Sequence, residues 1–275
     1  MRLGRTGAAV AVMLATVGCA PSTGPRLPNK DVEAFRQRLF VGAALQSNIS
    51  YLAAGDSLGP RLILVHGTPG SAKGWANYLI DPPAGVEVLA LDRPGFGESG
   101  PEGAVTGLAE QAAAVVALLP TDGRKTVLVG HSSGGPIIAW VAAQQPGRIA
   151  ALVLLAAALD PQLEVIHPMQ YVGAIWPIRL LLPRAIRNSN AELMALKPEL
   201  QALRGMLGSL ALPVIIVHGS ADSLAPPANV DYMRQQFRSV PCIETRLLKE
   251  VGHFLPWNSE VAVRSAINWA LAAAC

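Results

Sequence analysis

The sequence predicts an α/β domain built on a mostly parallel sheet with helices on both faces. Short apolar runs recur along the 275 residues, each bounded by Gly, Pro or a polar turn, as in strands buried on both faces. Segments with apolar residues at helical spacing alternate with these runs, which is the order of βαβ units. Hydrophobic residues make up 51% of the chain and charged residues 15%, which indicates a sizeable core.

The expected elements follow from these patterns. Weak alternation within 41–54 indicates an opening antiparallel hairpin, preceded by a polar arm or helix at 30–38. Apolar runs then predict buried strands at 61–65, 86–91, 126–129, 149–156, 214–217 and 243–248. Helices are expected between them at 71–79, 104–119, 133–144, 226–237 and 259–274.

Residues 160–212 interrupt the alternation. The segment is apolar and contains five prolines, so we expect helix only in short pieces. We interpret it as a small helical lid at the strand ends of a single domain that covers 36–275. Its run Ile175–Leu182 indicates either an apolar pocket for an acyl or alcohol group or a simple cover for the core.

The N-terminus is typical of an export signal. Arg2 and Arg5 precede the uncharged apolar run Gly7–Gly18, which at about a dozen residues is shorter than the roughly 20 that cross a bilayer. We therefore predict a signal peptide at 1–19 and a linker or arm at 20–35. The expected location is the periplasm or the cell envelope.

Cys19 is the candidate for lipid attachment. Small residues before it and a Pro/Gly/Ser-rich segment after it resemble a bacterial lipoprotein signal, in which the cysteine carries lipid and becomes the first mature residue. Thr16 departs from that pattern, which usually has Leu there. The alternative is ordinary cleavage after Ala20, with Gly18 and Ala20 as the pair of small residues.

The other cysteines and the charges limit the classes of partner. Cys242 and Cys275 form an even pair, which predicts either a disulfide between the last strand and the last helix or two buried thiols. No Cys/His spacing indicates a metal site. The net charge is +3 and no run of Lys or Arg is present, so the sequence argues against a nucleic-acid partner.

The stretch 125–136, KTVLVGHSSGGP, carries the strongest chemical signal. An apolar strand enters the turn GHSSG at 130–134, and a helical segment follows. Such a strand–turn–helix holds its central side chain out at the edge of the sheet, and the crowded backbone requires small residues two positions before and after it. Ser132 is therefore the predicted nucleophile.

A serine nucleophile needs a base and an acid. His253 lies on the loop after the last predicted strand, where its ring could reach Ser132. Asp222 follows the strand at 214–217 and precedes His253, the order in which the acid is expected. Capping of a turn is the alternative role for Asp222, and Asp160 is the second candidate acid. The other histidines end strands, lie inside the turn or lie in the lid: His66, His131, His167 and His218.

The negative charge that develops on the substrate oxygen needs backbone N–H donors. The amide of Ser133 is fixed by the turn and lies at the N-terminus of a helix, where the helix dipole favours negative charge. Thr68, in the loop after the strand at 61–65, is the second candidate, because Pro69 has no N–H to donate.

Five motifs in this order resemble the α/β-hydrolase family. The resemblance covers nearly all of 61–274 and rests on HGTPG at 66–70, DRPGFGES at 92–99, GHSSG at 130–134, HGSAD at 218–222 and GHF at 252–254. It implies an eight-stranded sheet with a lid. It also implies Ser132 as nucleophile, His253 as base and Asp222 as acid, with Thr68 and Ser133 as oxyanion donors.

The pattern GFGESG at 95–100 also spells a dinucleotide-binding motif, but Pro101 and Gly103 delay the helix that should follow it directly. We expect no cofactor. The expected reaction is hydrolysis of a small, apolar carboxylic ester through an acyl-enzyme.

Two groups of alternatives stay open. The same triad serves thioesterases, carbon–carbon bond hydrolases, acyltransferases and cofactor-free haloperoxidases. A non-catalytic binding module anchored in the envelope is the alternative from another class.

Overall fold

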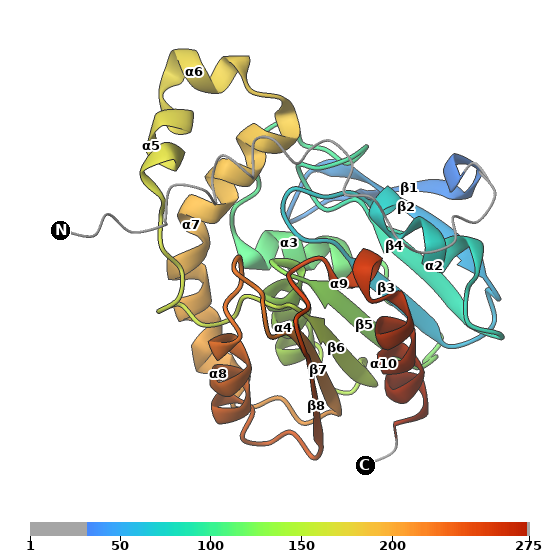
Figure 1. Cartoon of the computed structure of the whole chain (residues 1–275). Coiled ribbons are helices and arrows are strands. Elements are labelled where there is room, and N and C mark those ends of the chain that lie inside the picture. The colour runs from blue at the N-terminus through green and yellow to red at the C-terminus, as the bar shows by residue number, and fades with distance from the viewer. Residues whose placement is uncertain (1–31, 274–275) are drawn as a thin grey trace.

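The structure, a computed structural model, describes residues 32–273 and contains one eight-stranded sheet between two layers of helices (Figure 1). The strand order is β1-β2-β4-β3-β5-β6-β7-β8, and only β2 runs antiparallel to its neighbours. This confirms the mostly parallel sheet. The strands are β1 (Arg36–Val41), β2 (Ser47–Gly55), β3 (Arg61–Val65), β4 (Glu87–Leu91), β5 (Thr126–His131), β6 (Ala151–Leu155), β7 (Val214–Gly219) and β8 (Ile243–Leu248).

The helices lie between the strands, as the alternation predicts. Two short 3₁₀ helices are η2 (Val32–Phe35) and η3 (Ala72–Trp75). The α-helices are α2 (Ala76–Ile80), α3 (Leu108–Val116), α4 (Gly134–Gln144), α5 (Pro168–Ala174), α6 (Trp176–Leu181), α7 (Arg184–Leu207), α8 (Ala228–Gln236), α9 (Leu255–Asn258) and α10 (Glu260–Ala272). Within the described residues, none of the helices is both long and apolar enough to cross a membrane.

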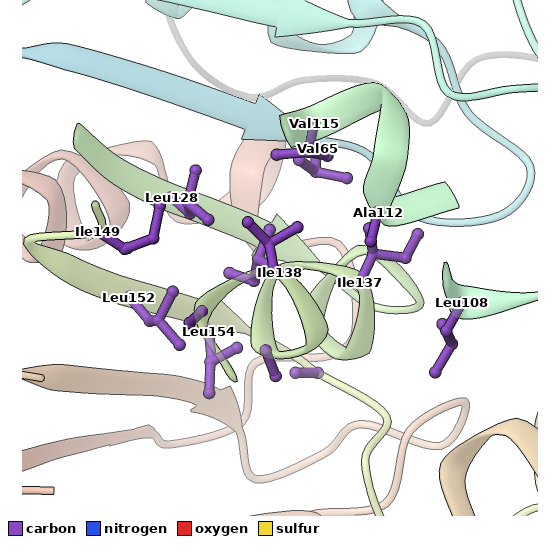
Figure 2. Packing of buried hydrophobic residues seen from close by; sticks show 14 of the residues in the cluster. Val65, Leu108, Ala112, Val115, Leu128, Ile137, Ile138, Ile149, Leu152 and Leu154 are labelled. Carbon is purple, nitrogen blue, oxygen red and sulfur yellow. The ribbon is translucent and has the colours of Figure 1, made fainter. Parts of the chain in front are cut away.

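The sheet has an apolar core on each face, because successive side chains of a strand point to opposite faces. In β3, Ile63 and Val65 belong to the core with α3, α4, α7 and α8, whereas Leu62 and Leu64 belong to the core with α2 and α10. Figure 2 shows the first core, in which α4 lies against β5 and β6 with α3 beside it. Burial on both faces explains why the central strands are continuous apolar runs.

The opening of the domain differs from the prediction. Residues 36–38 belong to β1, not to a polar arm or helix. β1 is an edge strand with mostly exposed or half-buried side chains, so it has no continuous apolar run to indicate a strand. It is held by Arg36, whose guanidinium donates to Asp92 over 2.7 Å and to Glu33 over 2.6 Å.

The lid also differs, because α7 is a continuous helix of 24 residues with Pro198 inside it. A proline within a helix costs about 3 kcal/mol. Leucines at 196, 200, 203 and 207 are buried in the core next to α4, and each contributes roughly 1.5–3 kcal/mol. Their burial therefore outweighs the proline, and the prediction of helix only in pieces is wrong for 184–207.

Several predictions fall outside the described residues. The signal peptide at 1–19, lipidation of Cys19, cleavage after Ala20 and most of the linker belong to the first 31 residues, and Cys275 belongs to the last two. Export, lipid attachment and the disulfide therefore stay predictions.

Candidate active site

The turn after β5 places Ser132 at the carboxyl edge of the sheet. Ser132 has a φ of 54°, a left-handed conformation that is uncommon for residues other than glycine, and α4 begins two residues later. A Cβ on Gly130 would lie 2.5 Å from the carbonyl oxygen of Gly134, so the turn has no room for a side chain there. The backbone N–H of Ser132 donates to Leu155 over 2.9 Å, which ties the turn to β6.

The two serines of the turn are in different environments. Ser132 is partly exposed, whereas Ser133 is 2% exposed and its Oγ has no hydrogen-bond partner in the described chain. A nucleophile must be reached by substrate. The arrangement therefore favours Ser132 as the reacting side chain and leaves Ser133 only its backbone amide to contribute.

The predicted base and acid are in direct contact. Nδ1 of His253, on the loop between β8 and α9, lies 2.8 Å from Oδ2 of Asp222, on the loop after β7. Because a carboxylate can only accept, Nδ1 carries the hydrogen and Nε2 is left with its lone pair, free to accept a proton. The two residues lie 31 positions apart in the sequence and meet because β7 and β8 are adjacent and parallel.

Asp222 is held in its ionised form. Its Oδ1 accepts from the amides of Leu224 and Ala225, each over 2.9 Å. Burial acts to raise the pKa of Asp222, but the hydrogen bonds from His253, Ala225 and Leu224 outweigh it and hold the pKa below the usual value. The charge on Asp222 would stabilise His253 when the ring becomes protonated.

The third contact of the predicted triad is not formed. Ser132 Oγ makes no hydrogen bond to His253 within residues 32–273. The neighbouring His131 donates to the carbonyl oxygen of His253 over 3.0 Å, and the two rings are 4.9 Å apart between centroids, so the loop of His253 lies against the turn. Such hydrogen bonds are often long before substrate binds.

The other candidates take structural positions. Asp160 accepts from the amide of Gln162 and does not contact His253. Nε2 of His218 lies 2.8 Å from the carbonyl oxygen of Ala225. Burial, followed by the charge on His253, lowers the pKa of His131 to about 3. Burial likewise lowers the pKa of His66 and of His218.

The loop after β3 approaches the nucleophile. A Cβ on Gly67 would lie 2.8 Å from Cβ of Ser132, so the backbone of this loop passes directly beside it. Within residues 32–273, the amides of Thr68 and Ser133 donate to no acceptor, and Ser133 lies at the N-cap of α4. Two free amides next to an accessible serine can donate hydrogen bonds to a substrate oxygen.

A buried ion pair, not predicted from the sequence, supports this loop. The guanidinium of Arg93 is fully buried, donates to both carboxylate oxygens of Glu192 on α7, and donates to the carbonyl oxygen of Gly67 over 3.1 Å. Oγ1 of Thr68 also bonds to Ser189 of α7 over 3.0 Å. The lid helix thus holds the loop that contributes Thr68.

Replacing Glu192 with glutamine is expected to lower the free energy of unfolding by about 3–5 kcal/mol, because the charge of Arg93 stays buried without a counter-ion. The matched control is Glu102→Gln. Glu102 also pairs with two arginines, but its side chain is 77% exposed, so the loss should be at most about 1 kcal/mol. Urea denaturation measures both, and equal losses would contradict the argument.

A cavity of about 310 Å³ lies under the lid next to these loops. Its wall is mainly apolar and includes Pro69, beside Thr68, and Leu224, two residues after Asp222. A second cavity, of about 470 Å³, lies at the amino ends of the strands among 120–125 and 147–150, away from the loops of Thr68 and Asp222. Of these two cavities, the one under the lid lies beside both loops and is the candidate for holding a substrate.

Among the described residues that line the lid cavity, Glu164 is the one with a carboxyl group. Burial, and next the charge on Asp160, raises its pKa to about 7, while Lys197 opposes the shift. Because this pKa lies above the ordinary value of 4.5, the folded state holds the proton more tightly than the unfolded chain. Its contribution to stability is therefore complete below pH 4.5 and is lost as the pH rises to about 7.

Replacing Glu164 with glutamine is expected to remove this pH dependence. The Tm of the variant should rise relative to that of the native protein as the pH increases from about 4.5 to 7, and the difference should then stay constant. Thermal unfolding followed across this range tests the expectation. Glu110→Gln, at an exposed position, is the control. A Tm difference between Glu164→Gln and the native protein that does not change with pH would contradict the expectation.

Sequence reasoning found the residues that carry motifs and missed those that support them. Arg93 lies in the motif at 92–99, but no local pattern indicates its partner Glu192, which is 99 residues away. Within the described residues, no group of three or more His, Cys, Asp or Glu side chains is arranged to hold a metal ion.

The sheet, the serine turn after β5 and the Asp–His pair on the loops after β7 and β8 together define the α/β-hydrolase fold. The family described as alpha/beta hydrolase fold matches residues 60–185. The chain therefore has the α/β-hydrolase fold.

Known proteins with similar sequences or structures have several activities. The chain is 29% identical, over 80% of its length, to the dihydrolipoyllysine-residue acetyltransferase component of the acetoin cleaving system of Pseudomonas putida, and spans only 64% of that relative. It is 26% identical to the pimeloyl-[acyl-carrier protein] methyl ester esterase of Aeromonas salmonicida, over 71% of this chain and 89% of the relative. The solved 2-hydroxy-6-oxo-6-phenylhexa-2,4-dienoate hydrolase of a Rhodococcus species superposes with a TM-score of 0.67 at 21% identity, over 86% of this chain and 98% of that one.

Proposed function

We propose that the protein is a serine hydrolase that cleaves carboxylic esters through an acyl-enzyme. The observation that carries the proposal is the 2.8 Å contact between His253 and Asp222 beside the accessible Ser132. The unbonded amides of Thr68 and Ser133 add a place for the oxyanion. The methyl ester esterase of Aeromonas salmonicida, which aligns with most of this chain, supports an ester as substrate.

In the first half of the reaction, Oγ of Ser132 attacks the ester carbonyl carbon while Nε2 of His253 takes its proton. The carbonyl oxygen becomes an oxyanion that accepts hydrogen bonds from the amides of Thr68 and Ser133. Collapse of this intermediate breaks the ester C–O bond, and the alcohol leaves with the proton from Nε2. Asp222 stabilises the protonated ring throughout.

In the second half, Nε2 of His253 takes a proton from water as the water oxygen attacks the acyl carbon. The second oxyanion uses the same two amides. Its collapse returns the proton to Oγ of Ser132 and releases the carboxylic acid. The mainly apolar wall of the lid cavity favours an apolar acyl or alcohol group, since polar groups lose hydration there without partners.

A fluorophosphonate probe tests the proposal, because it phosphonylates only an activated serine. We expect labelling of the native protein, with the modified peptide containing Ser132, and no labelling after heat denaturation. Failure of the native protein to react would favour the alternative of a non-catalytic binding module.

A panel of p-nitrophenyl esters of increasing acyl length, with matched thioesters, then separates esterase from thioesterase activity. Addition of acceptor alcohols identifies an acyltransferase by the new ester it forms. Carbon–carbon bond hydrolysis and haloperoxidase activity need their own substrates in the same panel.

A further inference from the structure

The lid carries the largest group of exposed apolar side chains in the described chain. Neither α5 nor α6 contains a buried residue, and both project beyond α7, away from the sheet (Figure 1). Trp176 is 70% exposed and Leu181 is 85% exposed. The other large, exposed apolar side chains of this segment are Val165, Met169, Tyr171, Val172, Ile175 and Leu180. Patches of this kind mark sites of interaction.

The charges of the segment have one sign. The sequence from 165 to 190 contains no Asp or Glu, but it contains Arg179, Arg184 and Arg187. Arg184 and Arg187 pair with Glu102. Arg179 is exposed, and its guanidinium contacts no carboxylate among the described residues. An apolar surface with a free cation and an exposed Trp is complementary to the interface of an anionic bilayer.

The patch is continuous with the lid cavity. Met169 and Val172 belong to the patch and also line the cavity.

From these three observations we propose that α5 and α6 dock on the surface of an anionic phospholipid bilayer. The side chains of Trp176, Leu180 and Leu181 enter the boundary between headgroups and acyl chains, and Arg179 contacts lipid phosphate. The mouth of the lid cavity then faces the lipid phase, from which an apolar ligand can enter. Docking needs no chemistry at Ser132, so it stands or fails separately from the proposed ester hydrolysis.

Vesicle co-sedimentation tests the docking. The full chain carrying Cys19→Ser, which cannot be lipidated, is mixed with vesicles of equal parts phosphatidylcholine and phosphatidylglycerol. Adding Trp176→Ser, Leu180→Ser and Leu181→Ser should weaken binding by about tenfold or more. The matched control replaces three similarly exposed apolar residues away from the lid, Leu58, Leu247 and Val261, and should bind as the parent does.

Two further measurements make the test specific. Arg179→Gln should weaken binding to the anionic vesicles but not to vesicles of phosphatidylcholine alone, since only the former attract a cation. Thermal unfolding shows whether each variant is folded. Equal loss in the lid and control variants would overturn the proposal, as would failure of the parent to bind. Sedimentation analysis of the parent provides one more outcome. If the parent is a dimer, if the lid substitutions dissociate it while the control substitutions do not, and if vesicle binding is unchanged, the proposal is overturned and the patch is an interface with a second copy of the chain.

Discussion

Replacing Ser132 with alanine is expected to lower kcat for p-nitrophenyl ester hydrolysis by about 10⁶-fold, since the group that forms the acyl-enzyme is lost. The residual rate would come from the oxyanion donors and from binding alone. Steady-state kinetics on the purified variant measure the loss. Circular dichroism and thermal unfolding should match those of the native protein, because the partly exposed side chain of Ser132 adds little to the core.

Ser133→Ala is the matched control within the same turn. Its backbone amide remains in place, and the lost hydroxyl is buried without a partner, so only a modest fall in kcat is expected. Equal losses in the two variants would contradict the assignment of Ser132 as nucleophile.

Replacing Asp222 with asparagine is expected to lower kcat by about 10⁴-fold. The asparagine oxygen can still accept from Leu224 and Ala225, but its NH₂ group then faces Nδ1 of His253 and requires that nitrogen to accept. The hydrogen of the ring moves to Nε2, which can no longer take the proton of Ser132.

Asp160→Asn provides the comparison for this variant, because Asp160 is the other carboxylate that the order of strands allows as the acid. Its carboxylate caps a turn at Gln162, so kcat should be nearly unchanged. A larger loss for Asp160→Asn than for Asp222→Asn would move the acid to the loop after β6.

The sequence predicted those parts of the fold in which local pattern and tertiary environment agree. β3 and β8 have the predicted bounds because each is a short run between turn residues. β1 was missed because an edge strand needs no apolar run. α7 was missed because Pro198 indicates a break locally, whereas the burial of leucines that stabilises the helix depends on elements distant in the sequence.

The candidate site shows the same division. Ser132, Asp222 and His253 could be predicted because strand order places the carboxyl ends of parallel strands at one edge of the sheet. The bond between Arg93 and Glu192 could not be predicted, since it joins a loop after β4 to a helix of the lid and no local pattern indicates Glu192 as the partner of Arg93. The support that α7 gives to the loop of Thr68 therefore becomes apparent only from the structure.

The two halves of α7 limit how the lid can be exchanged in an engineered protein. Its C-terminal half is part of the core next to α4. Its N-terminal half carries Ser189, which bonds to Thr68, and Glu192, which holds Arg93 against the loop of Thr68. A graft that replaced all of 160–212 would remove part of the core and the support of that loop along with the cover of the cavity. The modular unit is 160–183, which ends before α7 begins, and new substrate pockets are best introduced by exchanging this segment alone.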